Sequence, residues 1–328
     1  MANGRTKTTK KTQSLYLQDD VISAIDTIAE KTGQNKSQVV ESYLKTAVDD
    51  LTSDSEKAMI VTVMSFKGGV AKTTSAANLS LCLGENDNKV LVIDLDGQGS
   101  ISQYLGVYDP RAEELCIADV MLADNKGMRK TLSEVIVSTD YKNVDIVPSS
   151  FRFSDADSKM RSEASSGIDS RLKYAIEDLL KERHYDYVVI DCPPSLGLVV
   201  TNAITALEAG NSNSMIVIPV RVDGFAIAGL SNTVNTIESV ARERRTPVRQ
   251  WKLLRTITEK RSVAYKEGIK LIEDQFKNAQ FFSACISKAT VVVESTLAMQ
   301  PLMEYDPASK AAAEYRQFTE EIEDLNIR

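Results

Sequence analysis

Four short apolar runs stand out between positions 59 and 217, and each is followed within a few residues by glycine, proline or aspartate. The runs are Met59–Met64, Val90–Ile93, Tyr187–Ile190 and Met215–Val217. Runs this short, with little polar alternation, are typical of strands buried on both faces, as in parallel sheets. We therefore predict an α/β fold with a doubly wound, mostly parallel sheet.

The first fifty residues follow a different pattern. Leu15 and Leu17 alternate with polar or aromatic neighbours, which predicts a short strand with two faces. Apolar positions at helical spacing predict a helix over Asp19–Lys31 that Thr32-Gly33 ends. Asn35 can cap a second helix, whose apolar face is Val39, Val40, Tyr43, Leu44, Ala47 and Val48. About forty residues cannot bury a stable core alone, so we expect this module to dimerise.

These patterns divide the chain into three parts. We expect residues 1–51 to form a basic arm and the small module, residues 52–57 (T-S-D-S-E-K) a linker, and residues 58–328 the α/β domain. Ser149–Ser170 is rich in Ser, Asp and Arg, which predicts a mobile loop or a solvated helix start.

Composition excludes several classes of protein. No run of about eighteen apolar residues and no signal peptide is present, so we expect a cytoplasmic protein. The four cysteines are far apart and form no C-x-x-C pair, which indicates reduced core thiols. His184 is the only histidine, so a histidine-based metal site or catalytic triad is improbable.

Charge is unevenly distributed along the chain. The net charge of −7 argues at first against a nucleic-acid partner. However, Met1–Lys11 carries four basic residues and no acid, and Ala241–Arg261 carries eight basic residues against two glutamates. Acids gather instead near Glu320–Asp324. The two basic segments are therefore candidates for contact with a phosphate backbone.

The segment after the first run has the pattern of a phosphate-binding loop. Phe66–Thr74 reads F-K-G-G-V-A-K-T-T. Gly68 and Gly69 let the backbone approach an oxyanion, and the amides that follow would point at phosphates from a helix N-terminus; these belong to Val70, Ala71, Lys72, Thr73 and Thr74. Lys72 would reach the β- and γ-phosphate oxygens of a nucleotide, and the Thr73 hydroxyl would hold Mg²⁺.

This loop departs from the ordinary P-loop. Phe66 and Ala71 stand where that pattern has glycine, and an extra lysine, Lys67, opens the loop. Glycines with nearby lysines also occur in surface turns, but the preceding strand and the following motifs favour the phosphate loop.

Two further runs end in carboxylates. Asp94 and Asp96 follow Val90–Ile93, and Asp191 follows Tyr187–Ile190. In a doubly wound sheet such residues lie at the carboxyl edge, where ligands bind. Asp191 can hold Mg²⁺ through water, as a Walker B residue does. An Asp-Gly turn that merely closes a strand is the alternative for Asp96.

Together, the three motifs resemble the ParA/MinD group of P-loop ATPases, and the similarity covers about residues 58–325. The resemblance implies Mg²⁺-dependent ATP hydrolysis in a nucleotide-sandwich homodimer, in which Lys67 contacts the phosphates bound by the partner subunit. Asp96 would orient the attacking water, and Asp94 would lie near the Mg²⁺ shell. Gly97 replaces the proline of the family's D-x-D-P-Q motif, and we expect it to loosen this loop.

Later segments extend the resemblance. Ile218-Pro219-Val220 looks like the family's adenine-side loop, which places Pro219 and Val220 near ATP. The stretch Pro301–Tyr315 looks like its C-terminal helix signature. The acidic tail does not fit a membrane-cycling regulator like MinD, which would need a basic amphipathic tail.

The small module, from Lys10 to Leu51, resembles the ribbon-helix-helix DNA-binding fold. That resemblance implies that two strands pair in a dimer and enter the major groove. Thr12, Ser14 and Tyr16 would face the bases, while Asn35, Lys36 and Ser37 would hold phosphate. A dimerisation hairpin without DNA is the alternative.

The resemblance as a whole implies an ATPase for plasmid or chromosome partition. Its ATP-bound dimer would bind DNA non-specifically through Arg242, Arg244 and Arg245, although a solvated helix face explains these residues equally well. The small module would bind an operator or partition site and autoregulate. We expect a nucleoid-associated protein with a centromere-binding, ParB-like partner. The alternative is an ATP-modulated transcriptional repressor without a transport role.

Overall fold

The computed structural model describes residues 17–44, 57–107, 115–163, 166–223, 225–246, 249–259, 261–277 and 279–327. The chain divides into two compact units, Met1–Ser53 and Asp54–Arg328. This division falls within the stretch 52–57 that we expected to be a linker. Among the described helices, none has the length and apolarity needed to cross a membrane.

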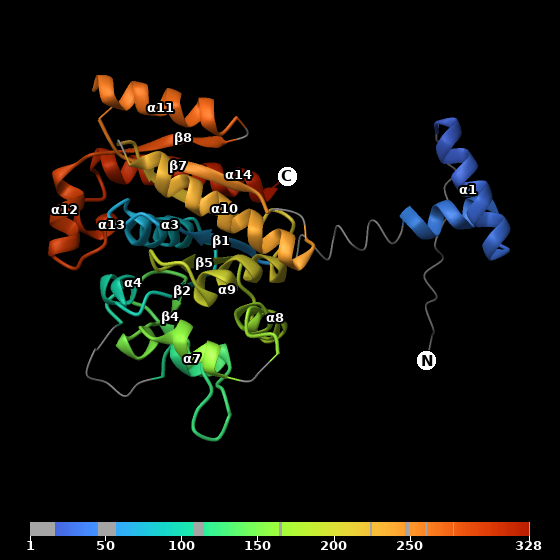
Figure 1. Ribbon diagram of the computed structural model, residues 1–328, viewed down its shortest axis with the longest axis horizontal. Coiled ribbons are helices and arrows are strands. Elements are labelled where there is room, and N and C mark those ends of the chain that lie inside the picture. The colour runs from blue at the N-terminus through green and yellow to red at the C-terminus, as the bar shows by residue number, and fades with distance from the viewer. Residues whose placement is uncertain are drawn as a thin grey trace, which may run out of the picture. The chain divides into compact units, whose positions relative to one another are not determined.

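An eight-stranded sheet forms the centre of the larger unit, in the order β3-β4-β2-β5-β1-β6-β7-β8 (Figure 1). The strands are β1 (Met59–Val63), β2 (Val90–Asp94), β3 (Val137–Ser138), β4 (Val144–Val147), β5 (Tyr187–Asp191), β6 (Met215–Arg221), β7 (Trp251–Thr258) and β8 (Gln280–Ser287). Every pairing is parallel except that of β3 with β4. The predicted doubly wound, mostly parallel fold is confirmed.

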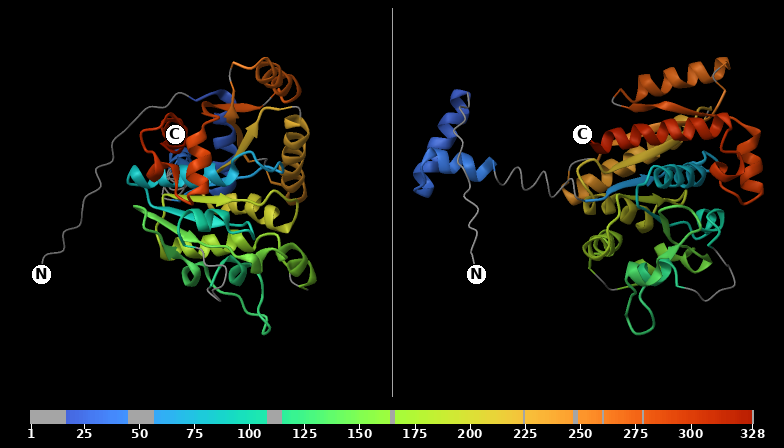
Figure 2. Two further views of the ribbon diagram at one scale, coloured as in Figure 1. Left: turned by 90° about the vertical axis from the view of Figure 1, so that its left-hand side faces the viewer. Right: turned by 180° about the vertical axis from the view of Figure 1, so that it is seen from behind.

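Helices cover both faces of this sheet. One face carries α5 (Ile117–Met121), α6 (Leu132–Val135), η1 (Phe151–Phe153), α7 (Ala156–Ser162), α8 (Arg171–Glu182), α9 (Leu198–Ala206), η2 (Leu207–Ala209), α10 (Ala226–Arg244) and α11 (Val263–Gln275). The other carries α3 (Lys72–Glu85), α4 (Ser100–Tyr104), α12 (Thr290–Leu297), α13 (Leu302–Tyr305) and α14 (Lys310–Ile327). Helix α10 lies toward the viewer in Figure 1 and α14 in the reverse view of Figure 2.

The uniform apolarity of the strands follows from these two layers. Successive side chains of a strand point to opposite faces. In β1, Ile60 therefore joins the core on one face, while Met59 and Val61 join the core on the other. All five residues of β1 are buried, and the hydroxyl of its one polar residue, Thr62, donates to Ala203 O at 3.2 Å.

One local expectation is wrong, and a second, which left two alternatives open, is met by its helical alternative. Ile218-Pro219-Val220 is part of β6 rather than a loop; beyond Val217, β6 pairs with β7 alone, and a strand with an open side accommodates a residue without an N–H group. For Ser149–Ser170 we expected a mobile loop or a solvated helix start. Among its described residues this stretch contains η1 and α7, and its Phe153 and Met160 are buried in the core.

Helix α14 protects the open edge of the sheet along β8. The Glu321 carboxylate accepts hydrogen bonds from the backbone N–H groups of Ser283 (2.8 Å) and Ala284 (2.6 Å). Glu314 accepts one from Ser287 N–H at 2.7 Å. Glu321, which we read from the sequence only as part of a charged tail, therefore satisfies the backbone of an edge strand, as Glu314 also does.

In the smaller unit, the structure describes two helices. Helix α1 (Asp19–Thr32) ends at Gly33, whose φ is +69° and whose N–H donates to Ala29 O at 2.9 Å, as the sequence predicted. Residues 36–44 form the second helix. Its start has a reciprocal cap, in which Asn35 Oδ1 accepts from Gln38 N–H (2.9 Å) and Gln38 Oε1 from Asn35 N–H (3.0 Å). The predicted strand Thr12–Leu17 lies outside the described residues except for Leu17.

Candidate functional site

The carboxyl ends of three neighbouring strands bring the sequence motifs together. Strand β1 lies between β5 and β6, with Val63 opposite Asp191. Asp94, the last residue of β2, is paired in register with Asp191, the last residue of β5. The loop 64–71 continues from β1 at the same edge. The predicted convergence of the phosphate loop with Asp94 and Asp191 is therefore observed.

The phosphate loop has the backbone shape that its glycines suggest. Gly69 has φ +69°, and a Cβ added to Gly68 or Gly69 would meet no atom within 4 Å, so the loop faces open space. Ala71, with φ 63° and ψ 36°, is the N-cap of α3 and adopts the left-handed conformation that glycine reaches most easily. The first turn of α3 contains no acidic residue, so no side chain of that turn neutralises the positive end of the helix dipole.

Lys72 projects from the first turn of α3 toward the carboxylates. Its side chain is buried, and its Nζ lies 3.4 Å from the carbonyl oxygen of Lys67. Burial lowers the pKa of Lys72, while the charges of Asp191, Cys192 and Asp96 act in the opposite direction. Lys72 is therefore a buried cation without a direct carboxylate partner among the described residues, a state that an incoming anion would stabilise.

Asp191 is the residue that best fits a role toward a metal ion. It is fully buried, and neither of its carboxylate oxygens has a hydrogen-bond partner in the described part of the chain. Burial and the neighbouring Asp94 raise the pKa of Asp191 well above its usual value, although Thr73 and Lys72 act to lower it. Buried polar atoms without partners require an explanation, and a divalent cation shared with the Thr73 hydroxyl supplies one.

The carboxylate of Asp94 accepts several hydrogen bonds, unlike that of Asp191. Its Oδ1 accepts from Asp96 N–H (3.0 Å), and its Oδ2 accepts from the N–H (3.2 Å) and hydroxyl (2.7 Å) of Ser102 on α4. Burial raises the pKa of Asp94 to about 7. Asp94 thus anchors α4 as well as lining the site. No cluster of three metal-binding side chains occurs among the described residues.

Gly97 packs closely against Ser154, and our expectation that it loosens the loop carrying Asp96 stays a prediction. A Cβ at position 97 would lie 2.6 Å from Ser154 Cα, which follows η1. Proline also has a Cβ and could not approach this closely. Asp96 itself is partly exposed, and its Oδ1 accepts from Gln98 N–H at 3.0 Å. The absence of a side chain at Gly97 therefore allows this loop to lie close to Ser154.

Three residues that sequence reasoning missed hold the phosphate loop in place. The Thr233 hydroxyl on α10 accepts from Phe66 N–H at 3.3 Å, and the Thr256 hydroxyl on β7 donates to Val70 O at 3.0 Å. Asp223, which follows β6, forms an ion pair with Lys67. The only signal in the sequence was the position of Asp223 four residues beyond Pro219, which the family resemblance had placed near the nucleotide. Pro219 and Val220 are buried within β6.

The predicted DNA-contact residues lie away from this site. Because α10 runs back across the sheet, its C-terminal residues Arg242, Arg244 and Arg245 lie toward the opposite edge. Arg244 pairs with Asp169 (2.8 Å) and Glu208 (3.3 Å), whereas Arg242 and Arg245 are exposed.

In the smaller unit, two of the residues predicted to contact phosphate interact instead with neighbours in their own unit. Lys36 forms an ion pair with Asp26 at 2.5 Å, Asn35 caps the second helix, and Ser37 is exposed. The predicted base contacts Thr12, Ser14 and Tyr16 lie outside the described residues.

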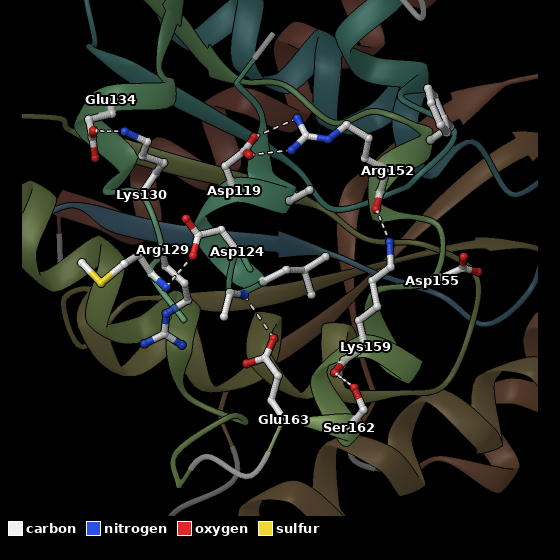
Figure 3. A pocket seen from close by; sticks show the side chains of 15 residues that line it. Asp119, Asp124, Arg129, Lys130, Glu134, Arg152, Asp155, Lys159, Ser162 and Glu163 are labelled. Atoms are coloured by element: carbon white, nitrogen blue, oxygen red, sulfur yellow. Dashed lines mark hydrogen bonds and ion pairs between the residues drawn. The ribbon is translucent and has the colours of Figure 1, made fainter. Parts of the chain in front are cut away.

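A separate cavity of about 910 Å³ opens beside α5, α6 and α7 (Figure 3). Four of its charged side chains pair with one another: Arg152 binds Asp119 at 2.5 Å and 3.0 Å, and Lys130 binds Glu134 at 2.8 Å. No residue of the phosphate loop lines it. The cavity is therefore not the nucleotide site.

Comparisons with known proteins agree with this geometry. Residues 58–249 match the AAA domain family. The sporulation initiation inhibitor protein Soj of Bacillus subtilis is 31% identical over 265 residues, which cover 80% of this chain and 97% of Soj. The chromosome partitioning protein ParA of Myxococcus xanthus is 27% identical over 256 residues, with coverage of 78% and 84%.

A solved structure is similar in fold and carries a nucleotide. The cobyrinic acid a,c-diamide synthase of Mycobacterium smegmatis, with bound ATP analogue and magnesium, has a TM-score of 0.64 at 26% identity, covering 80% of this chain and 93% of that one. The phosphate loop, the paired aspartates and these similarities together show that the chain belongs to the ParA/MinD-type family of P-loop ATPases.

Proposed function

We propose that this protein is a DNA-partitioning ATPase in which ATP binding joins two subunits and hydrolysis separates them. The observation that carries the proposal is the arrangement of two lysines around one loop. Lys72 is buried beside Asp191, whereas the side chain of Lys67 is 22% exposed at the opening of the same loop. One lysine can thus serve the nucleotide of its own subunit, and the other can reach a second subunit.

ATP and Mg²⁺ fit the residues at this edge. The amides from Val70 to Thr74 would hold the phosphates, and Thr73 and Asp191 would hold Mg²⁺. When bound, Mg²⁺ neutralises charge on the phosphate oxygens. Asp96 would orient the attacking water, and its partial exposure beside the buried pair supports this role. Pro219 and Val220 would lie on the adenine side.

We assign a second, site-specific contact with DNA to the smaller unit. Five large apolar side chains of its described part are exposed, namely Leu17, Val21, Ile22, Tyr43 and Leu44, and Val39 is its only fully buried apolar residue among those described. Such a unit gains a core by pairing with a second copy, as a ribbon-helix-helix module does. We propose that this dimer binds an operator and autoregulates, and that a ParB-like partner stimulates hydrolysis.

Non-specific DNA binding would then fall to exposed basic residues of the ATPase unit. Because Arg244 is neutralised by Asp169 and Glu208, Arg242 and Arg245 are the better candidates of the three. An ATP-modulated repressor is the second candidate, since the smaller unit is separate from the ATPase unit. Stimulation of turnover by a DNA-bound partner would favour partition over repression.

The test measures DNA binding and association in the full chain. Binding to promoter DNA and to random DNA is measured without nucleotide, with ADP and with ATP. We expect promoter binding in all three states and random-DNA binding only with ATP, with a strong dependence on salt. Sedimentation velocity should show an ATP-dependent change in association that Lys67→Ala removes while ADP affinity is retained. An unchanged ATP response in Lys67→Ala contradicts the proposal.

A further inference from the structure

Lys67 is held by its own subunit. Its Nζ forms an ion pair with Asp223 Oδ1, and the two side chains are 22% and 33% exposed. Asp223 is itself fixed, because the same Oδ1 accepts from Phe225 N–H at 3.0 Å. Arg221 Nε lies 3.9 Å from the other carboxylate oxygen. The carboxylate is therefore oriented by its own turn and shared by two cations.

The stem of Lys67 is also positioned, and helix α10 provides the surface. Gly229 faces it so closely that a Cβ at position 229 would lie 3.2 Å from Lys67 Cβ. The Lys67 carbonyl oxygen accepts from Lys72 Nζ at 3.4 Å, and the Thr233 hydroxyl accepts from the N–H of Phe66, the residue before Lys67, at 3.3 Å. The lysine thus lies against α10 and ends at Asp223. An ammonium group engaged in this way is not free to reach the phosphates of a second subunit.

We propose that Asp223 is a positioning residue that keeps Lys67 within its own subunit until ATP bound by a second subunit competes for it. Asp223 thereby sets the ATP concentration at which the two subunits join. This inference rests on the proposed role of Lys67 in the sandwich dimer. It assigns to Asp223 no contact with nucleotide.

The charge and solvent exposure of Asp223 determine how strongly it holds Lys67. Partial burial acts to raise the pKa of Asp223, but the hydrogen bonds from Lys67 and Phe225 outweigh it and hold this pKa below its usual value. Asp223 therefore stays ionised throughout the neutral range. A partly exposed ion pair stabilises the paired state of Lys67 and Asp223 only modestly. Its loss should therefore change the equilibrium between paired and released Lys67 about two- to fivefold.

The experiment compares substitutions at Asp223 in the full chain. Asp223→Asn removes the charge but keeps an oxygen that can accept from Phe225 N–H, and Asp223→Glu keeps the charge. Asp178→Asn is the matched control, because it breaks an exposed ion pair with Lys181 on α8. The half-saturating ATP concentration for turnover is measured beside the affinity for fluorescent ADP, which lacks the γ-phosphate.

We expect Asp223→Asn to lower half-saturating ATP about two- to fivefold with ADP affinity unchanged, and Asp223→Glu and Asp178→Asn to behave as the wild type. An unchanged or raised ATP requirement in Asp223→Asn overturns the inference, as does an equal shift for ADP. The Lys67→Ala variant distinguishes a failure of the proposed dimer mechanism from a failure of the proposed role of Asp223. If it turns over ATP like the wild type, the proposed dimer mechanism fails; if it is inactive while Asp223→Asn shifts nothing, only the role of Asp223 fails.

Discussion

The phosphate loop offers a direct test of backbone strain, because it contains neighbouring glycines in different conformations. Gly69 has φ +69°, whereas Gly68 has no left-handed φ, and an added Cβ would meet nothing within 4 Å at either position. Gly69→Ala and Gly68→Ala therefore add the same methyl group to equally open space. Any difference in their free energies of unfolding reports the backbone conformation alone.

The magnitudes follow from two opposing effects. An L-residue in the left-handed region costs roughly 1–2 kcal/mol. Replacing Gly by Ala stabilises by about 0.4–1 kcal/mol through the unfolded chain. Gly69→Ala should thus destabilise the unit by up to about 1.6 kcal/mol, and Gly68→Ala should stabilise it by about 0.4–1 kcal/mol. Ala71→Gly, at φ 63°, should relieve strain and act in the opposite direction to Gly69→Ala.

Urea unfolding without nucleotide measures these differences. Trp251 is the only tryptophan and lies in β7, so its fluorescence reports on the larger unit. Equal effects of Gly69→Ala and Gly68→Ala would refute the reasoning, because they would show that the left-handed backbone carries no strain. A destabilising Ala71→Gly would refute it independently.

Three further predictions concern the loop after β2, the catalytic water and the sheet edge. Gly97→Pro should clash with Ser154, cost about 1–3 kcal/mol in urea unfolding and displace Asp96, lowering turnover more than ADP affinity. Asp96→Ala should bind ATP and Mg²⁺ but hydrolyse ATP about 10²-fold or more slowly, and so stay on DNA; wild-type turnover would assign the role elsewhere. Glu321→Ala should leave two backbone N–H groups of β8 without an acceptor and cost about 1–3 kcal/mol, whereas the exposed Glu320→Ala should be nearly neutral; equal effects would contradict the edge-strand argument.

The sequence predicted the parts of the molecule that depend on local pattern. Strands buried on both faces have no polar side, so runs such as Val90–Ile93 showed their position within one residue of β2. The phosphate loop was equally visible, because few other structures need Gly68, Gly69 and Lys72 at this spacing. The carboxylates followed, since parallel strands end at one edge of the sheet.

Features that depend on segments far apart in the chain were not predictable. Thr233, Thr256 and Asp223 support the phosphate loop from positions more than 150 residues later, and none of them carries a local signal. The close approach of Gly97 to Ser154 was not predictable, because Ser154 comes from a distant segment for which we expected a mobile loop or a solvated helix start. Likewise, the charge of Arg244 could be discounted only after Asp169 and Glu208 were found beside it.

The position of β1 in the chain has a consequence for synthesis on the ribosome. This strand is first in sequence among the described strands yet central in the sheet, and its Met59 pairs with Tyr187, which is made 128 residues later. At roughly 5–20 residues per second, β1 waits on the order of ten seconds for its first neighbour and longer for β6. During this time its apolar surface is open to chaperones or to other nascent chains. Nucleotide binding by a newly made subunit therefore indicates that β5 and β6 have paired with β1, the first of these strands to be synthesised.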